Sequence, residues 1–281
     1  MSTRIIPRLD IKGSNLVKGI HLEGLRVLGR PESFARYYYE AGADELIYID
    51  AVASLYERNS LMHIIERTSR EIFIPLTVGG GVRTLQDIKA ILRAGADKVS
   101  LNTAAVRDPQ LIREASRAFG SSTIVISMEV IKRRDGTYEC FTDNGRIPTG
   151  LEVVAWAKRV AELGAGEILL TAVDREGTGK GYDLELIRSV SEAVSIPIIA
   201  SGGAGTAQHV CDAVLVGKAD AVALSSILHY HYIKNAKQDL SELTEGNVNF
   251  IHSGEGYSKV DAIELSDLRA FLANRGISSA R

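Results

Sequence analysis

Two glycine-rich segments have the composition and spacing of phosphate-binding turns. The first is Ile72–Gly81 and the second is Ser195–Ala204, and their prolines, Pro75 and Pro197, are 122 residues apart (75 to 197). Glycine lets backbone N–H groups approach phosphate oxygens, and helices predicted to begin at Thr84 and Thr206 direct their positive ends toward an anion. The alternative is a pair of tight strand-to-helix turns that only require positive φ. Two equivalent copies favour phosphate binding, and they predict a substrate with a phosphate at each end.

Polar pairs end the strands predicted to follow these two turns. Hydroxyl and amide groups there can donate further hydrogen bonds to the same phosphates. The predicted phosphate-binding residues are therefore Gly80, Gly81, Asn102 and Thr103 in the first copy, and Gly202, Gly203, Ser225 and Ser226 in the second.

Two carboxylates end predicted strands in corresponding halves of the chain. Asp10 follows the first strand and Glu129 the fifth, and such strand ends carry the reactive groups of α/β barrels. In a two-fold barrel the pair faces each other across the mouth, where two carboxyl groups with separated pKa values can divide general-acid and general-base work. The alternative is that each carboxylate caps a loop or accepts a backbone hydrogen bond. The symmetric placement favours catalysis.

Four charged residues begin predicted strands at the opposite end. Arg4, Glu45, Lys98 and Glu167 start the first, second, fourth and sixth strands. If all four point inward, two cations and two anions form a charged ring that closes the barrel floor. Floor residues of such barrels usually serve stability, so a functional role requires a partner docked beneath the ring.

The histidines and cysteines show no spacing typical of a metal site. Cys140 and Cys211 form no CxxC motif and are expected to be buried or free thiols. His229 and His231 can chelate a metal on a strand, but a helix or loop is expected there. The sequence therefore predicts neither a metal nor a cofactor.

Length and composition indicate an ordinary soluble globular protein. The chain has 281 residues, 45% of them hydrophobic and 24% charged, with a formal net charge of −2. This balance gives no support for binding to nucleic acid or a membrane surface. The N-terminal segment lacks the apolar core of a signal peptide, and no apolar run is long enough to span a membrane. A cytoplasmic location is predicted.

β-branched runs alternate with amphipathic segments, which indicates a parallel sheet. Strands are predicted at 4–9, 45–50, 73–78, 97–101, 123–129, 167–172, 196–200 and 220–224, and helices at 31–40, 59–70, 84–93, 109–119, 150–162, 183–193, 206–214 and 266–274, the last capped by Ser266. Eight βα units predict an α/β fold, a single (βα)8 TIM barrel built from half-barrels of about 4–120 and 121–230. The rival fold, an open doubly wound sheet, lacks its GxGxxG fingerprint here.

Two segments interrupt this alternation. Residues 11–30 are too long for a simple βα loop, and we predict a mobile active-site lid there. Lys18 in this segment is either a solvated loop lysine or a residue that folds over a substrate phosphate or carbonyl. Residues of about 230–261 are polar and contain three glycines, which predicts an irregular surface insertion.

Taken together, these residues resemble the cyclase subunit family of imidazole glycerol phosphate synthase, from histidine biosynthesis. The resemblance covers nearly all of residues 4–230, and its most specific segment is Asp174–Thr178, followed by Gly181–Asp183. The sister isomerase of the pathway shares the duplicated barrel and differs at that segment. The resemblance implies a barrel of the ribulose-phosphate-binding type.

The resemblance also implies a reaction and a partner. In that family a glutaminase subunit docks on the barrel floor and ammonia crosses the interior to attack a bisphosphorylated ribulosyl-formimino aminoimidazole carboxamide. Ring closure and C–N cleavage give imidazole glycerol phosphate and aminoimidazole carboxamide ribotide. Asp10 matches the first catalytic acid. The implied ammonia gate is Arg4, Glu45, Lys98 and Glu167, and the implied substrate contacts are Lys18, Asp50, Thr171, Gly177 and Ser201.

Several positions depart from that family. Glu129 stands where the family has aspartate, and Arg8 stands where cysteine is common. One extra methylene moves a carboxylate by roughly 1.5 Å, and misplacements of about 1 Å can reduce a rate 10²-fold. Residues 50–59 also differ. These departures resemble a paralogue branch in which a cyclase-like barrel and a glutaminase supply ammonia to a sugar amidotransferase in surface-polysaccharide pathways. The sequence leaves both roles open.

Overall fold

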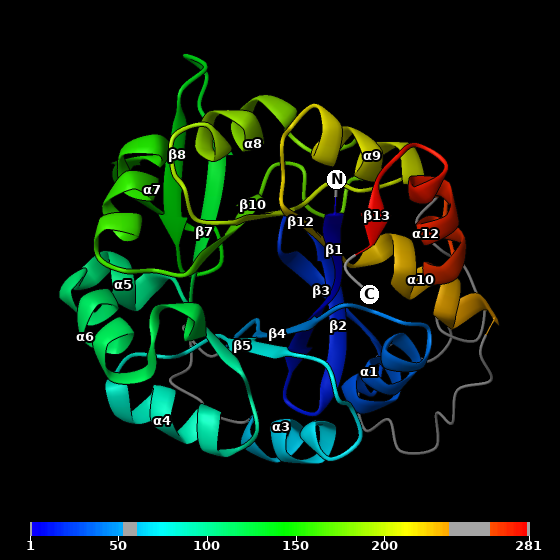
Figure 1. Cartoon of the computed structure of the whole chain (residues 1–281), viewed down its shortest axis with the longest axis horizontal. Coiled ribbons are helices and arrows are strands. Elements are labelled where there is room, and N and C mark those ends of the chain that lie inside the picture. The colour runs from blue at the N-terminus through cyan, green and yellow to red at the C-terminus, as the bar shows by residue number, and fades with distance from the viewer. Residues whose placement is uncertain (1, 53–60, 236–258, 280–281) are drawn as a thin grey trace.

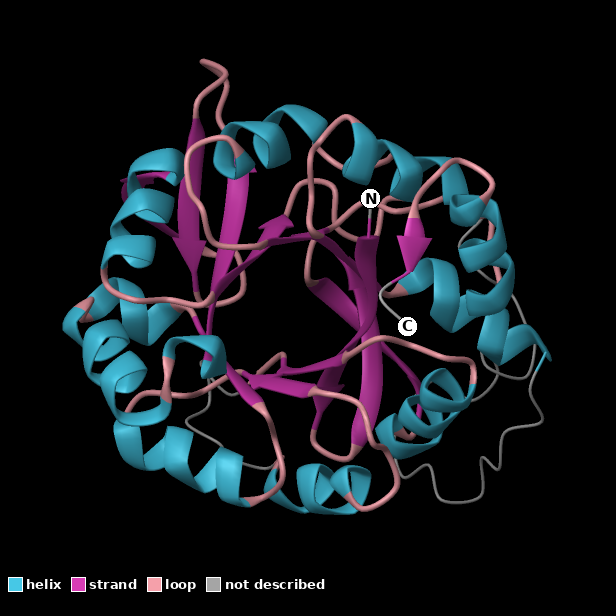
Figure 2. Ribbon diagram, viewed as in Figure 1, coloured by secondary structure: helices cyan, strands magenta, loops and turns pink. Residues whose placement is uncertain are grey.

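A computed structural model describes residues 2–52, 61–235 and 259–279 of the chain. Eight of the described strands are parallel and close into a barrel, because β10 pairs with β7 as well as with β11 (Figures 1 and 2). The ring runs in chain order through β1 (Ser2–Lys12), β4 (Leu46–Asp50), β5 (Leu76–Gly79), β6 (Lys98–Leu101), β7 (Ile124–Lys132), β10 (Glu167–Ala172), β11 (Ile198–Ser201) and β12 (Ala221–Leu224). The predicted (βα)8 TIM barrel is confirmed.

Helices surround the strands on the outside of the ring (Figure 2). They are α1 (Pro31–Glu40), α3 (Met62–Ser69), α4 (Leu85–Arg93), α5 (Thr103–Arg107), α6 (Gln110–Phe119), α7 (Val153–Glu162), α8 (Leu184–Ser191), α9 (Ala207–Leu215), α10 (Ser226–Asn235) and α12 (Leu265–Ala273), with a short 3₁₀ turn at Ser121–Thr123. A two-residue strand, β13 (Ser278–Ser279), pairs with the start of β1. No helix among these described segments is long and apolar enough to cross a membrane.

The barrel strands separate two apolar layers. Side chains that face outward pack against the helices, and those that face inward fill the barrel. The inner layer contains Ile6, Ile47, Val125, Leu169, Ile199, Ala221 and Ala223. Both faces of each strand are therefore buried, which is why the strands are almost continuously hydrophobic in sequence.

Equivalent threonines cap the helices that follow the two glycine-rich segments. The Thr84 hydroxyl accepts a hydrogen bond from the Asp87 N–H, and the Asp87 carboxylate completes a capping box. The Thr206 hydroxyl accepts from the His209 N–H in the same way. The helix starts predicted at Thr84 and Thr206 are confirmed, and both copies of the repeat use the same local chemistry.

The predicted lid at residues 11–30 is wrong in its local structure. The segment extends β1 into an antiparallel hairpin, β2 (Asn15–Ile20) and β3 (Glu23–Gly29). Its turn has positive φ at His21 and Leu22. Two-residue hairpin turns of that kind usually contain Asn-Gly or Asp-Gly, so His21-Leu22 is not an ordinary hairpin signal.

A second hairpin extends β7 in the same way. β8 (Tyr138–Thr142) pairs antiparallel with both β7 and β9 (Ile147–Glu152). The β8–β9 turn has positive φ at Asp143, Asn144 and Gly145. The helix predicted to start at residue 150 therefore starts at Val153, because residues 150–152 belong to β9.

Two predictions near the C-terminus are also corrected. Residues 230–235 belong to helix α10 and are not irregular, while 236–258 of the predicted insertion lie outside the described residues. Helix α12 is preceded by Glu264 and has Ser266 within its first turn, so Ser266 is not the cap. Residues 53–60, which include the predicted start of the second helix, also lie outside the described residues.

Candidate active site

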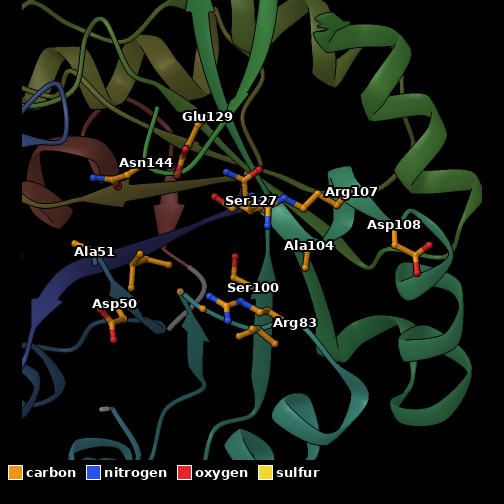
Figure 3. Close-up of a pocket in the computed structure, with 16 residues that line it drawn as sticks. Asp50, Ala51, Arg83, Ser100, Ala104, Arg107, Asp108, Ser127, Glu129 and Asn144 are labelled. Carbon is orange, nitrogen blue, oxygen red and sulfur yellow. The ribbon is translucent and has the colours of Figure 1, made fainter. Parts of the chain in front are cut away.

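A pocket of about 260 Å³ opens beside the first glycine turn, Gly79–Gly81. Its described lining comes from the ends of β4, β5, β6 and β7, from α5, and from the β8–β9 turn (Figure 3). The lining residues are Ile49, Asp50, Ala51, Gly80, Gly81, Val82, Arg83, Ser100, Asn102, Thr103, Ala104, Arg107, Asp108, Ser127, Glu129 and Asn144. One cavity therefore contains Asp50, Glu129 and the predicted phosphate-binding residues of the first copy, Gly80, Gly81, Asn102 and Thr103.

The backbone of the first glycine turn requires glycine. Gly80 has φ +96°, and a Cβ at this position would lie 2.4 Å from the Asp50 carbonyl oxygen. The second glycine turn, Ser201–Gly203, has the same property, since Gly203 has φ +106° and its Cβ would lie 2.2 Å from the Gly181 carbonyl oxygen. Both copies thus have the positive φ that the alternative, a pair of tight strand-to-helix turns, also requires. Phosphate binding by these turns stays a prediction.

Arginine side chains surround the first glycine turn. Arg83 lies two residues after it, in the loop between β5 and α4, and Arg107 ends α5; both side chains line the pocket and are labelled in Figure 3. Arg107 is also 3.6 Å from a carboxylate oxygen of Asp143. Arginine binds phosphate through a planar fork of N–H donors, so this half of the mouth suits an anionic ligand.

Glu129 lies at the point where β7 leaves the barrel and enters its hairpin. It is opposite Thr171 on β10 and Phe141 on β8. Its Oε2 accepts a 2.7 Å hydrogen bond from the Gly145 N–H. Burial raises the pKa of Glu129 to about 7, while the Gly145 N–H and the charge of Arg8 oppose the rise. A carboxyl group that titrates near neutral pH is suited to proton transfer.

Asp10 occupies the corresponding junction on β1, opposite Ile49 on β4 and Val17 on β2. Its Oδ1 accepts a 3.0 Å hydrogen bond from Nε of Arg8, and both side chains are buried. The two predicted catalytic carboxylates thus stand at corresponding strand–hairpin junctions, on β1 and on β7. Each has a different partner: an arginine for Asp10 and a backbone N–H for Glu129.

Thr171 and Ser201 do not line the pocket described above. Their hydroxyl oxygens both accept hydrogen bonds from Nη1 of Arg8, at 3.0 Å and 3.2 Å. Ser225 donates from its hydroxyl to the Arg8 carbonyl oxygen at 2.9 Å, and Ser226 begins α10 and is buried. Arg8 therefore links the second half of the predicted site to Asp10.

Lys18 lies on β2, where the hairpin brings it into the barrel mouth. Its buried ammonium group pairs with the carboxylate of Glu176 and is 4.0 Å from Oδ2 of Asp10. Gly177, next to Glu176, allows the hairpin to pack closely, because a Cβ there would lie 2.4 Å from the Gly19 carbonyl oxygen. Lys18 thus reaches the predicted site through a strand and not through a loop.

The four predicted floor residues come together as a ring of alternating charge. Nη1 of Arg4 is 2.7 Å from Glu45 and 3.0 Å from Glu167, and Nζ of Lys98 is 3.0 Å from each of the same carboxylates. The ring forms at the N-terminal ends of the strands, opposite the pocket. The geometry matches the predicted arrangement, and the role of a gate stays a prediction.

Comparison with known proteins places this site in a family. A model described as "Histidine biosynthesis protein" matches residues 4–234, which include every residue of the site. The chain belongs to the histidine biosynthesis protein family.

Individual relatives of this family match most of the chain. A protein of Alkaliphilus metalliredigens (strain QYMF) named imidazole glycerol phosphate synthase subunit HisF is 49% identical over 245 residues, 86% of this chain and 97% of that protein. A Legionella pneumophila protein of the same name is 57% identical over 204 residues, 73% of this chain and 96% of that protein.

The described residues contain no group of three or more His, Cys, Asp and Glu side chains placed to hold a metal. His229 is on helix α10, as expected, and is fully buried. Cys140 and Cys211 are free and buried, as predicted.

Sequence reasoning missed part of the site. In the sequence, Arg8 is only a departure from a family pattern, and Glu176 is only part of a motif. No sequence pattern distinguishes Arg83 or Arg107 from other surface arginines. The turn signal Asp143–Gly145 could have indicated the second hairpin, and with it the Gly145 N–H beside Glu129.

Proposed function

We propose that this chain is the cyclase subunit of imidazole glycerol phosphate synthase. It uses ammonia to convert a bisphosphorylated ribulosyl-formimino aminoimidazole carboxamide to imidazole glycerol phosphate and aminoimidazole carboxamide ribotide. The observation that carries the proposal is the pair of carboxyl groups, Asp10 and Glu129, at equivalent strand–hairpin junctions of a duplicated barrel. The family membership and the names of the relatives support it.

The two carboxyl groups differ in a way that suits the reaction. Glu129 has a pKa of about 7, so a large fraction of its carboxyl groups carries a proton at neutral pH. That proton can be transferred to the departing nitrogen. Asp10 is ion-paired with Arg8 and accepts a proton from the attacking ammonia. Assigning one group as acid and one as base follows the general pattern of paired carboxyls in unlike surroundings.

Substrate binding uses the two glycine turns. The terminal phosphate nearest the pocket is bound by Gly80, Gly81, Asn102 and Thr103, with Arg83 and Arg107 adding positive charge. The other is bound at Gly202, Gly203, Ser225 and Ser226. Asp50, Thr171, Gly177 and Ser201 are retained as further substrate contacts.

The partner is a glutaminase subunit. It docks on the barrel floor, and ammonia enters through the ring of Arg4, Glu45, Lys98 and Glu167. The word subunit in the names of the relatives supports an assembly of this kind. We place the complex in the cytoplasm, with no nucleic-acid or membrane partner.

The direct test is cyclisation by the purified chain with saturating ammonium salt and no partner. Turnover of roughly 1 s⁻¹ or more, an ordinary enzymatic rate, supports the proposal. The Asp10→Asn variant should lose it. Tight binding of the bisphosphorylated substrate without turnover would instead indicate the other role considered from the sequence, ammonia supply to a sugar amidotransferase. The relatives named above do not favour that role.

A further inference from the structure

Arg8 projects from β1 into the upper part of the barrel and has all of its hydrogen bonds inside the site. Its side chain is 5% exposed. Nε donates to Asp10, and Nη1 donates to both Thr171 and Ser201. Burial opposes a charge on the guanidinium, but the carboxylates of Asp10 and Glu176 outweigh it and raise the pKa of Arg8. The side chain is a permanent buried cation.

The backbone of Arg8 is fixed as firmly as its side chain. Its carbonyl oxygen accepts hydrogen bonds from the Ser225 hydroxyl at 2.9 Å and from Nε2 of His229 at 3.0 Å. Nδ1 of His229 accepts from the Tyr38 hydroxyl at 2.6 Å. Burial lowers the pKa of His229 to about 3, so this support stays neutral and does not change across the working pH range.

Stability alone does not account for an arginine at this place. The layer below it inside the barrel is apolar, with Ile6, Val125 and Leu169 among its members. An apolar side chain can fill such a position, and replacing a buried ion pair by well-packed apolar residues is often neutral or stabilising. The position of Arg8, with its charge directed at Asp10, points to a role in the chemistry.

We infer that Arg8 is a positioning residue for Asp10. The guanidinium plane is held at one end by Thr171 and Ser201, and at the other it fixes Oδ1 of Asp10. The second carboxylate oxygen, Oδ2, is thereby left toward Lys18 and the mouth, ready to take a proton. This inference depends on the proposed cyclase function and assigns a residue that acts through Asp10.

The test compares Arg8→Gln, Asp10→Asn and the double variant in ammonium-driven cyclisation. Arg8→Gln keeps most of the volume and removes the charge. It is expected to lower kcat about 10²-fold with little change in KM, as misplacement of a reacting group by about 1 Å can do. In the Asp10→Asn background, Arg8→Gln should add less than about twofold, because residues that act as a unit are not additive.

Chemical rescue separates positioning from a purely structural role. Low millimolar guanidinium chloride should restore part of the kcat of Arg8→Ala and leave Asp10→Asn unaffected. Arg8→Lys should recover less than the rescued variant, since an ammonium group cannot span Asp10, Thr171 and Ser201 together. The inference would be overturned if Arg8→Gln lowered kcat by the same factor in the Asp10→Asn background as in wild type. It would also be overturned if guanidinium did not restore the kcat of Arg8→Ala.

Arg269→Gln is the matched control. It removes another guanidinium–carboxylate pair, 3.1 Å from Asp44 and remote from the mouth, so it should lower stability and leave kcat unchanged. An inactive wild-type chain would refute the proposed function itself. An active wild type with an unimpaired Arg8→Gln variant would refute only the role of Arg8.

Discussion

The glutamate at position 129 reaches farther than an aspartate would, and the hairpin turn beside it uses that length. Its Oε2 accepts from the Gly145 N–H. Gly145 has φ +75°, and a Cβ there would lie 2.9 Å from a methyl group of Val173, so glycine suits this position of the turn. The extra methylene of Glu129 thus brings its carboxylate to a specific hydrogen-bond donor, the Gly145 N–H. The sequence comparison alone suggested a misplaced carboxylate.

Glu129→Gln should separate activity from stability. The variant cannot carry the proton, so kcat should fall by about 10²- to 10⁴-fold. The raised pKa of Glu129, from 4.5 to about 7, means that the wild type loses stability as pH rises through this window. The free energy of unfolding of the variant minus that of wild type should therefore be about 1–2 kcal/mol higher at pH 8 than at pH 5, after allowing for solvent at the pocket edge. Urea unfolding at both pH values measures this, and an equal effect at both would contradict the assignment.

The same pKa predicts the shape of the wild-type pH profile. If Glu129 acts as the acid, kcat/KM should fall above about pH 7, because the protonated form is then depleted. The assay must keep the concentration of free ammonia constant at each pH. A profile that instead rises through pH 7 would make Glu129 the base.

Gly80→Ala tests the first glycine turn against a matched glycine. Gly80 and Gly120 have φ of +96° and +91°, but a Cβ at Gly120 meets nothing within 4 Å. Gly120→Ala should cost about 1 kcal/mol for the backbone conformation alone. Gly80→Ala should cost more and weaken phosphate binding, measured by calorimetry with inorganic phosphate. Equal losses of stability in the two variants would show that the close approach to Asp50 is unimportant.

At the scale of elements, two hairpins position the site. β2–β3 places Lys18 in the mouth, and its turn donates the His21 N–H to the Glu176 carbonyl oxygen at 2.9 Å. The β8–β9 turn meets the first hairpin, since Asn144 Nδ2 donates to the Leu22 carbonyl oxygen at 3.0 Å. The hairpins that extend the two catalytic strands therefore contact each other across the mouth.

Glu176→Gln should loosen the first hairpin. Of the two carboxylates paired with the Lys18 ammonium in the described part of the chain, the change leaves Asp10, at 4.0 Å, and breaking a buried pair costs about 3–5 kcal/mol. Against the effect of burial, Lys18 and Arg8 lower the pKa of Glu176, so its stabilising contribution is lost as pH falls, and the variant should lack this dependence. Urea unfolding and hydrogen exchange over residues 15–29 report the change.

The control for this prediction is Glu185→Gln. Glu185 pairs with Lys132 at 2.7 Å on the surface of the other hairpin, where such a pair contributes about 0–1 kcal/mol. Unchanged exchange in β2–β3 of Glu176→Gln would show that the ion pair does not hold the hairpin.

In the whole molecule, the barrel places two groups of polar residues at its opposite ends. The carboxyl ends of the strands hold the pocket and the candidate catalytic pair. The amino ends hold the charged ring, in which two cations and two carboxylates pair at 2.7–3.0 Å. The apolar inner layer of the barrel lies between these ends, and under the proposed function the ring acts on the ammonia that enters from below and does not contact the substrate.

Lys98→Met should impair the transfer of ammonia from the glutaminase partner to the active site. Glutamine-driven turnover with the glutaminase partner should fall severalfold, because the ring loses one of its two cations. Ammonium-driven turnover should stay unchanged. Stability should drop by roughly 1–3 kcal/mol, since Glu45 and Glu167 are left with Arg4 alone. Lys132→Met, on the surface, serves as the control. The gate would be refuted if the variant turned over as fast as wild type with glutamine as well as with ammonium.

The sequence alone determined the barrel, because its signals are local and repeated. Apolar β-branched runs and amphipathic segments fix where each strand and helix forms. The offset of 122 residues between Pro75 and Pro197 indicated the duplication, and the glycine turns, both carboxylates and the floor ring followed from their places at strand ends. The division at about residue 120 was inferred in the same way and stays a prediction.

Which of these residues lie together depends on barrel closure, which local sequence patterns do not encode. The His21–Leu22 turn has no common hairpin signature, so the strand that carries Lys18 was expected to be a loop. Arg8 contacts Thr171 and Ser201, which are more than 160 residues away in sequence, and Glu129 receives its hydrogen bond from a turn that sequence reasoning did not place. Local patterns encode secondary structure, whereas side-chain pairing and desolvation depend on segments that only barrel closure brings together.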